Sequence, residues 1–309
     1  MKRILLGILV VVLSQQTHAG ISFVDSQLSY VDAGYGLSNT FITGIDGSKV
    51  VGWYNSVGVP GPSGFVKDLN TGILSSFRLN QGYPGAGFQT YVRGISGNLI
   101  TGTYNNGGSE TSFVKDITTN ANLWANLPLG LYANGIYGSK IVGSANTGIA
   151  YTYSGFIYDG ATTSYFSAPN SLTTIAKANY GDKIIGTYTS SLDSANYGYV
   201  YNGSSFQTLF KPDAYMINPT GIYGDIIVGS LYESSDNKQH GFIYDGTNWT
   251  LVDVAGSNAT TLTGISGNTV TGTADGKSFV ATNAVPEPGS LALLEVGLAG
   301  LALFRRRRS

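Results

Sequence analysis

Six segments in the middle of the chain repeat one arrangement of apolar and polar positions. In each, an apolar stretch reaches Gly-Ile, a polar turn follows, and a β-branched stretch such as Val50-Val51 comes next; the fourth segment has Ala178-Asn179 in place of Gly-Ile. The turn glycines, most of them 43 residues apart, are Gly47, Gly97, Gly138, Gly181, Gly224 and Gly267. Five residues after each stands a second glycine: Gly52, Gly102, Gly143, Gly186, Gly229 and Gly272. Glycine turns between β-branched runs predict hairpins, and the fixed interval predicts a repeat protein.

Two further strands are predicted in each repeat. A polar loop leads to an aromatic strand such as Gly155-Phe156-Ile157-Tyr158, and a second turn such as Asp159-Gly160 follows it. A fourth strand comes next, as in residues 249–252. Four short antiparallel strands in about 43 residues are typical of a β-propeller blade.

The sequence therefore predicts an all-β fold, a six-bladed β-propeller, over residues 20–284. Leu28-Ser29-Tyr30-Val31 resembles a fourth strand before the first repeat, and the last repeat ends at its third strand, residues 278–280. The N-terminal strand could complete the last blade and so remove an exposed sheet edge. A linear β-solenoid is the alternative, although its terminal repeats would lack caps.

The N-terminus predicts a secretory signal peptide over residues 1–19. Lys2 and Arg3 precede an apolar run from residue 4 to residue 13, and Thr17-His18-Ala19 places small residues at a cleavage site after Ala19. The alternative is a membrane anchor, but a ten-residue helix would cover only about 15 Å, half of the hydrocarbon core.

Residues 285–309 form a tail with three parts. Pro286, Glu287 and Pro288 are followed by an apolar run, residues 291–304, which predicts a short transmembrane helix. The chain then closes on four arginines, Arg305, Arg306, Arg307 and Arg308. Basic residues favour the cytoplasmic side of a membrane, so the preceding domain is expected outside the cytoplasmic membrane, attached to it only by this helix.

This tail closely resembles the PEP-CTERM sorting signal of Gram-negative bacteria. The resemblance implies recognition and removal of the tail by the membrane protease exosortase, after signal peptidase has acted at the other end. It also implies a cell-surface or extracellular location and an association with exopolysaccharide and biofilm. Glu295 departs from the pattern, which normally has a small or apolar residue there. The repeats also resemble HAF-type extracellular repeats, with one clear His-Gly-Phe at residues 240–242.

Composition excludes several kinds of chemistry. The chain has no Cys, so Cys-ligated metal sites and disulfides are impossible, and cleavage after Ala19 would leave His240 as the single histidine. No nucleophile elbow, calcium loop or phosphate-binding glycine motif is present. We therefore expect no catalytic residue, cofactor or metal. Without the two ends, 11 basic residues face 16 acidic ones, which argues against a nucleic-acid partner.

Aromatic residues that follow the second glycine are candidate ligand contacts. Trp53, Tyr54, Tyr104 and Tyr188 could stack on sugars, and the polar loops 55–63 and 105–111 after them could add contacts. The alternative interpretation is packing between blades.

Three functions follow from these observations. The leading hypothesis is an exosortase-processed surface or biofilm-matrix protein that binds without catalysis, with exopolysaccharide as its candidate ligand. The alternative is a glycan-cleaving enzyme that uses Asp or Glu in the propeller funnel. An inert structural component of the matrix is the third.

Overall fold

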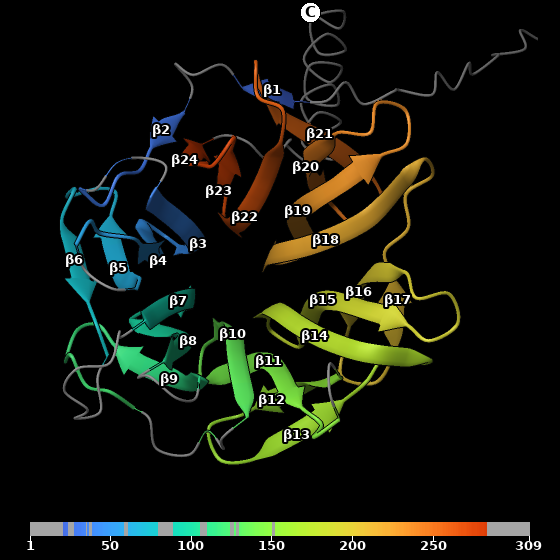
Figure 1. The fold of residues 1–309 in the computed structure, drawn as a ribbon, viewed down its shortest axis with the longest axis horizontal. Helices are drawn as coiled ribbons and strands as arrows, with labels where there is room; N and C mark the ends of the chain where they lie inside the picture. Colours follow the sequence, from blue (N-terminus) through green and yellow to red (C-terminus); the bar gives the residue numbers. More distant parts are fainter. Residues whose placement is uncertain are drawn as a thin grey trace, which may run out of the picture.

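The computed structural model describes residues 21–23, 28–34, 36, 39–58, 61–79, 89–105, 110–123, 127, 130–149 and 152–282. Their strands form six sheets arranged around one axis, with the first strand of each repeat innermost (Figure 1). The predicted six-bladed propeller is confirmed. The predicted signal peptide, the Pro286–Pro288 motif, the apolar run and Arg305–Arg308 lie outside the described residues.

Each sheet corresponds to one sequence repeat. Blades one and two contain β3 (Thr40–Asp46), β4 (Lys49–Tyr54), β5 (Ser63–Asp68) and β6 (Leu74–Phe77), then β7 (Gln89–Ser96), β8 (Leu99–Asn105) and β9 (Glu110–Asp116). Blades three and four contain β10 (Leu131–Tyr137), β11 (Lys140–Asn146), β12 (Tyr153–Tyr158) and β13 (Thr163–Phe166), then β14 (Ser171–Tyr180), β15 (Lys183–Ser190), β16 (Asn196–Tyr201) and β17 (Phe206–Thr208). Blades five and six contain β18 (Ala214–Tyr223), β19 (Ile226–Glu233), β20 (Gln239–Tyr244) and β21 (Trp249–Val254), then β22 (Thr260–Ser266), β23 (Thr269–Ala274) and β24 (Lys277–Thr282).

Blades two and five depart from the predicted four strands. In the described residues of blade two, the fourth strand is reduced to one bridge, Lys115 to Asn122. Blade five gains a fifth strand, because β1 (Ile21–Phe23) pairs in parallel with β21. Phe23 is buried there, so this short strand covers apolar surface at the rim of the ring.

The ring closes through the N-terminal strand, as predicted. β2 (Ser29–Tyr30) pairs with β24, with Ser29 opposite Val280. The amide of Val31 then donates to the Ser278 carbonyl at 3.0 Å. Across the seam, the Ser278 hydroxyl donates to the Thr40 carbonyl at 2.8 Å. The first and last repeats are therefore joined, and β24 is paired on its outer side by β2.

The hydrophobic core lies between neighbouring blades. One position of the third strand places a fully buried aromatic ring in every blade, and these rings are Phe65, Phe113, Phe156, Tyr199, Phe242 and Phe279. The residue before the ring is Gly in four blades and Ser in two. In blade one the position excludes a side chain, because a Cβ on Gly64 would lie 2.7 Å from a Val92 methyl group of the next blade.

The second repeat glycine is required by a close approach of backbone. In blade two, a Cβ on Gly102 would lie 1.9 Å from the Tyr91 carbonyl oxygen of β7. Five of the six blades give such a separation near 2 Å, and the sixth, at Gly272, gives 2.6 Å. The turn glycine has a different role: Gly97 has φ 58° with nothing near its missing side chain. A positive φ at the first turn residue is what a type II′ hairpin demands.

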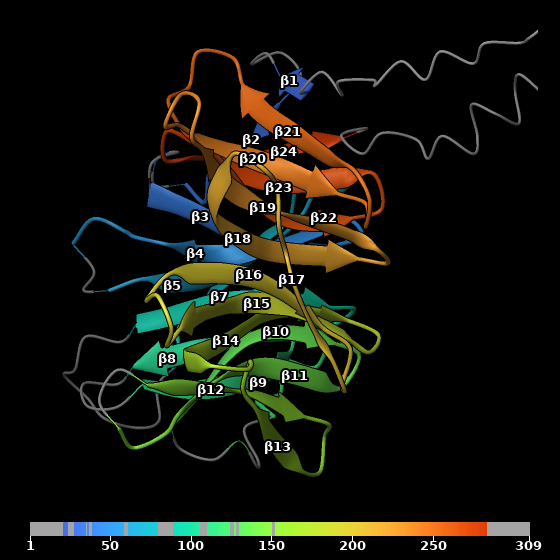
Figure 2. The ribbon, with the colours of Figure 1, turned by 90° about the vertical axis from the view of Figure 1, so that its right-hand side faces the viewer.

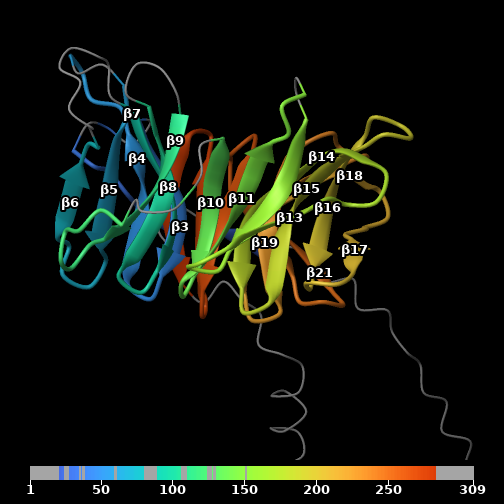
Figure 3. The same ribbon diagram turned by 90° about the horizontal axis from the view of Figure 1, so that it is seen from below.

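The propeller has two unlike faces, seen edge-on in Figures 2 and 3. The side that carries the six tight turns, each of which begins with a turn glycine, is called the hairpin face. The loop face is the opposite side, where the second strand connects to the third and the fourth strand connects to the next blade. Thr282 pairs with Thr269, directly after one of the tight turns. The described chain therefore ends on the hairpin face.

Candidate ligand-binding site

Every innermost strand contains a β-bulge at the same repeat position. In all six blades the pairing of the first and second strands shifts register at this position, for example between Ile42 and Gly44. The bulged residues are Thr43, Arg93, Asn134, Lys177, Thr220 and Thr263. A bulge turns a side chain out of the regular alternation, and here it directs all six side chains toward the axis.

The residue after each bulge closes the axis. These residues are Gly44, Gly94, Gly135, Ala178, Gly221 and Gly264, and they surround a space of about 70 Å³. Backbones touch here: a Cβ on Gly135 would lie 2.7 Å from the Ala178 Cα. The axial channel is therefore nearly blocked at this level.

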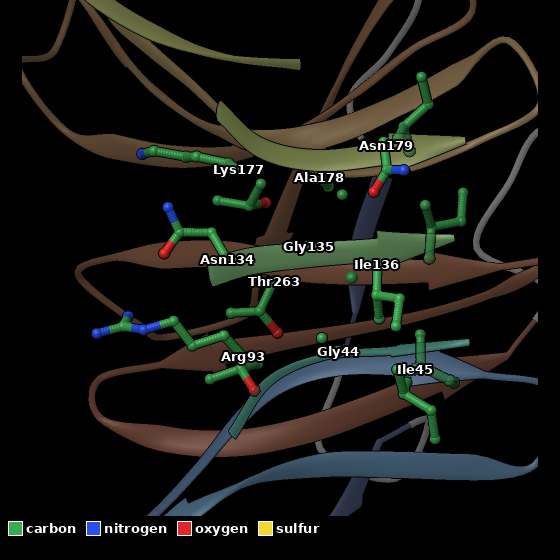
Figure 4. Close-up of a pocket in the computed structure, with 18 residues that line it drawn as sticks. Gly44, Ile45, Arg93, Asn134, Gly135, Ile136, Lys177, Ala178, Asn179 and Thr263 are labelled. Carbon is green, nitrogen blue, oxygen red and sulfur yellow. The ribbon is translucent and has the colours of Figure 1, made fainter. Parts of the chain in front are cut away.

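On the loop-face side of this constriction lies a cavity of about 350 Å³, which we call the axial funnel. Its lining consists of the six bulged residues with Ile42 and Ile175. Figure 4 shows the side chains of Arg93, Asn134 and Lys177 extending to the same side of the glycine level, away from Ile45 and Ile136. Hydroxyl, amide and cationic groups therefore converge on one concave surface.

Hydrogen bonds between blades fix the funnel wall. The Thr43 hydroxyl donates to the Val92 carbonyl at 2.8 Å, and the Thr220 hydroxyl donates to the Leu262 carbonyl at 2.7 Å. The side-chain amide of Asn134 donates to the Ala176 carbonyl at 2.9 Å. These contacts hold the wall in place, so that a ligand would not have to order it.

The two cations of the funnel differ in their surroundings. Lys177 donates to the Asn218 side-chain carbonyl, and burial lowers its pKa to about 8. Arg93 has one guanidinium nitrogen 4.0 Å from a Glu110 carboxylate oxygen, and its Nε is buried with no hydrogen-bond partner. Its guanidinium also lies 5.8 Å from the Tyr91 ring centroid. Among the described lining residues of the funnel there is no carboxylate.

The four aromatic residues singled out from the sequence divide into two pairs. Tyr54 and Tyr104 are buried in the clusters between blades, so their rings serve packing. Trp53 and Tyr188 are half-buried. Trp53 stacks on Phe41 with ring centroids 4.0 Å apart, and Tyr188 stacks on Tyr197 at 5.4 Å. Ligand stacking stays a prediction for this second pair.

The funnel residues themselves were missed by sequence reasoning. They stand directly before the Gly-Ile pair or its counterpart, at a position whose residue type changes from repeat to repeat. Aligning the six repeats on the turn glycine would have brought Arg93 and Lys177 to one level. Sequence reasoning relied on the positions that recur in every repeat, whereas the funnel residues occupy a position whose residue type varies between repeats.

His240 lies in a separate cluster on the loop face. Its Nδ1 is 2.9 Å from an Asp253 carboxylate oxygen, and its Nε2 is 3.1 Å from one of Asp236. Burial opposes the charged ring, but the hydrogen bonds and charges of Asp253 and Asp236 outweigh it and raise the His240 pKa. No group of three His, Cys, Asp or Glu in the described part of the chain could hold a metal ion.

This cluster predicts a pH dependence of stability. A raised folded-state pKa means that the charged imidazole stabilises the fold below the unfolded pKa of about 6.5. That contribution is lost as pH rises through the folded-state pKa. We expect the thermal midpoint to fall between about pH 6 and pH 8, and to fall less in His240→Gln. Thermal melts across this range check it, and a variant with the wild-type slope would contradict it.

Comparisons with known proteins agree with the fold and identify the tail. Residues 284–308 match the PEP-CTERM protein-sorting motif. Among curated proteins, none matches the chain. A prolyl endopeptidase structure is similar over 81% of this chain, with 15% identity and a TM-score of 0.53. The chain spans 41% of that protein's length, and the likeness concerns the fold alone.

A second similar structure is the β-propeller domain of the trilobed protease from Pyrococcus furiosus, described as having an open velcro topology. It is 12% identical, with 79% of this chain and 95% of that chain covered and a TM-score of 0.48. The described part of the present chain contains no helix of the length and apolarity needed to cross a membrane. The chain therefore combines a six-bladed β-propeller domain with a C-terminal PEP-CTERM protein-sorting motif, which implies export and cell-surface sorting by exosortase.

Proposed function

We propose that the propeller is a non-catalytic binding domain of the cell surface or biofilm matrix, and that its ligand is an exopolysaccharide. The axial funnel carries this proposal, because hydroxyl, amide and cationic side chains converge there on a pre-formed wall. Such groups hold the oxygen atoms of a polar ligand, as in other concave sites that use a few placed polar groups. A glycosidase would instead need a pair of carboxylates beside the bound sugar.

The position of the sorting tail supports the same use of the loop face. The last strand ends at Thr282 on the hairpin face, and eight residues separate Thr282 from the apolar run that begins at Leu291. Fully extended, eight residues span at most about 29 Å. While the tail is in the membrane, the hairpin face is the side nearer the bilayer, and the funnel opens away from it.

Glycan-array binding tests the proposal. Because the ring closes within residues 28–282, a protein of residues 20–284 contains every sheet and the seam. We expect it to bind one or more bacterial polysaccharides, with dissociation constants in the micromolar to millimolar range that is usual for a single small polar site. The same protein after heat unfolding is the control. No binding to any polysaccharide would contradict the proposal.

A further inference from the structure

We infer that the axial funnel binds the carboxylate of a uronic acid, at a chain end or side branch of an acidic polysaccharide. This inference rests on the proposed function and names the chemistry of its ligand. Three features of the funnel carry it: two cations without a carboxylate in the lining, a floor that is nearly closed, and aromatic rings beside the mouth.

The first feature is the unbalanced charge. Lys177 and Arg93 bring two positive charges to one cavity, while its other polar side chains, Thr43, Asn134, Thr220 and Thr263, are neutral. The Lys177 ammonium donates a hydrogen bond to the neutral side-chain amide of Asn218. Burying a cation without a counter-charge lowers the stability of the folded protein. An anionic ligand would supply that counter-charge. Charged side chains in unfavourable surroundings are concentrated at functional sites.

Arg93 leaves room for the same ligand. Its ion pair with Glu110 spans 4.0 Å and is partly exposed, so it is weak. The buried Nε of Arg93 has no partner in the protein. A planar carboxylate is the group that a guanidinium binds best, through two parallel hydrogen bonds.

The second feature is the shape of the funnel. At about 350 Å³ it lies at the small end of ligand pockets, and the glycine level below it leaves only about 70 Å³. A polymer cannot thread through this constriction, so a ligand must enter and leave on the loop face. The funnel therefore suits a terminal sugar or a short branch.

The third feature is an aromatic path that leads from the funnel between blades one and two. The Arg93 guanidinium lies over the Tyr91 ring, Tyr91 meets Trp53 edge to face at 5.3 Å, and Trp53 stacks on Phe41. All three rings are half-buried. Partly exposed aromatic rings offer apolar faces to the C–H side of sugar rings that follow the bound one.

Calorimetric titration of the 20–284 protein tests the inference with three probes: trigalacturonate, maltotriose as the neutral trisaccharide, and inorganic phosphate. We expect trigalacturonate to bind about tenfold or more tightly than maltotriose, since one charge-assisted contact is worth about that much. Lys177→Met removes the charge and keeps the stem, so it should weaken trigalacturonate binding about tenfold. Arg93→Gln probes the funnel wall two blades away and should weaken trigalacturonate binding likewise.

Lys183→Met is the matched control. Lys183 belongs to the same blade but makes an exposed ion pair with Asp225 near the hairpin face, so this variant should bind like the wild type. Circular dichroism checks that each variant folds. Trigalacturonate affinity unchanged in both Lys177→Met and Arg93→Gln would overturn the funnel assignment, and so would equal binding of maltotriose.

The outcomes also separate this inference from the proposed function. Array-positive glycans that bind both funnel variants as well as the wild type would leave the binding function standing and remove the funnel from it. Binding of phosphate without trigalacturonate would overturn the sugar acid as ligand. If no polysaccharide on the array and no probe binds, the proposed function falls with the inference.

Discussion

Gly102→Ala is expected to destabilise the propeller by about 3–5 kcal/mol, far more than a glycine substitution usually costs. The new Cβ would lie 1.9 Å from the Tyr91 carbonyl oxygen, and its next neighbours are also backbone atoms of β7. No side chain can rotate away to make room. The strand itself must shift, and with it the bulge that presents Arg93 to the axis.

Gly97→Ala is the control for this prediction, on the same hairpin and five residues earlier. Its Cβ would meet nothing within 4 Å, so the substitution costs only the left-handed backbone, about 1–2 kcal/mol. Urea unfolding monitored by circular dichroism gives the loss of unfolding free energy for each of the two variants. Equal urea midpoints for the two variants would contradict the idea that Gly102 is needed for the close approach of the Tyr91 carbonyl.

Val31→Asp is expected to open the ring at its seam. Val31 is 2% exposed and packs in the cluster that holds Ile42 of the first blade and Val280 of the last. A carboxylate at this position would be buried without a charged partner in that cluster, at a cost of about 3–5 kcal/mol. Because β2 is short, we expect it to detach and leave the edge of β24 open to pairing between molecules.

Ser29→Asp is the control for the seam, since Ser29 is exposed in the same segment and should tolerate the charge within about 0.5 kcal/mol. Thermal melting measures stability, and size-exclusion chromatography measures association. Val31→Asp that melts like the wild type and stays monomeric would mean that the seam does not hold the ring together.

Much of the fold was predictable because its constraints are local and repeated. A glycine that must take a positive φ, and another that must let a carbonyl approach, are needed once per blade, so Gly97 and Gly102 recur at fixed intervals. The closing strand was also predictable, because the final repeat lacked its last strand and residues 28–31 matched it. The three residues of β1 are too few to show any period, so their pairing with β21 was not anticipated.

The candidate site was less predictable, for a physical reason. A side chain that faces the axis packs against no repeated neighbour, so its type is free to differ from blade to blade, as Thr43, Arg93 and Lys177 do. The aromatic residues after the second glycine were a clearer pattern. Two of them, Tyr54 and Tyr104, are buried, because alternate residues of a strand face the core between blades.

The seam has a further consequence, for the order of events during export. If the predicted signal peptide leads export, the chain emerges N-terminus first, and β2 is outside before β24, its partner. The last pairing of the ring needs Val280, and the matched sorting motif begins only four residues later, at residue 284. We therefore expect the ring to close only once the residues directly before the sorting motif have emerged. A chain released too early would be both unsorted and unclosed, with β2 left without its partner strand.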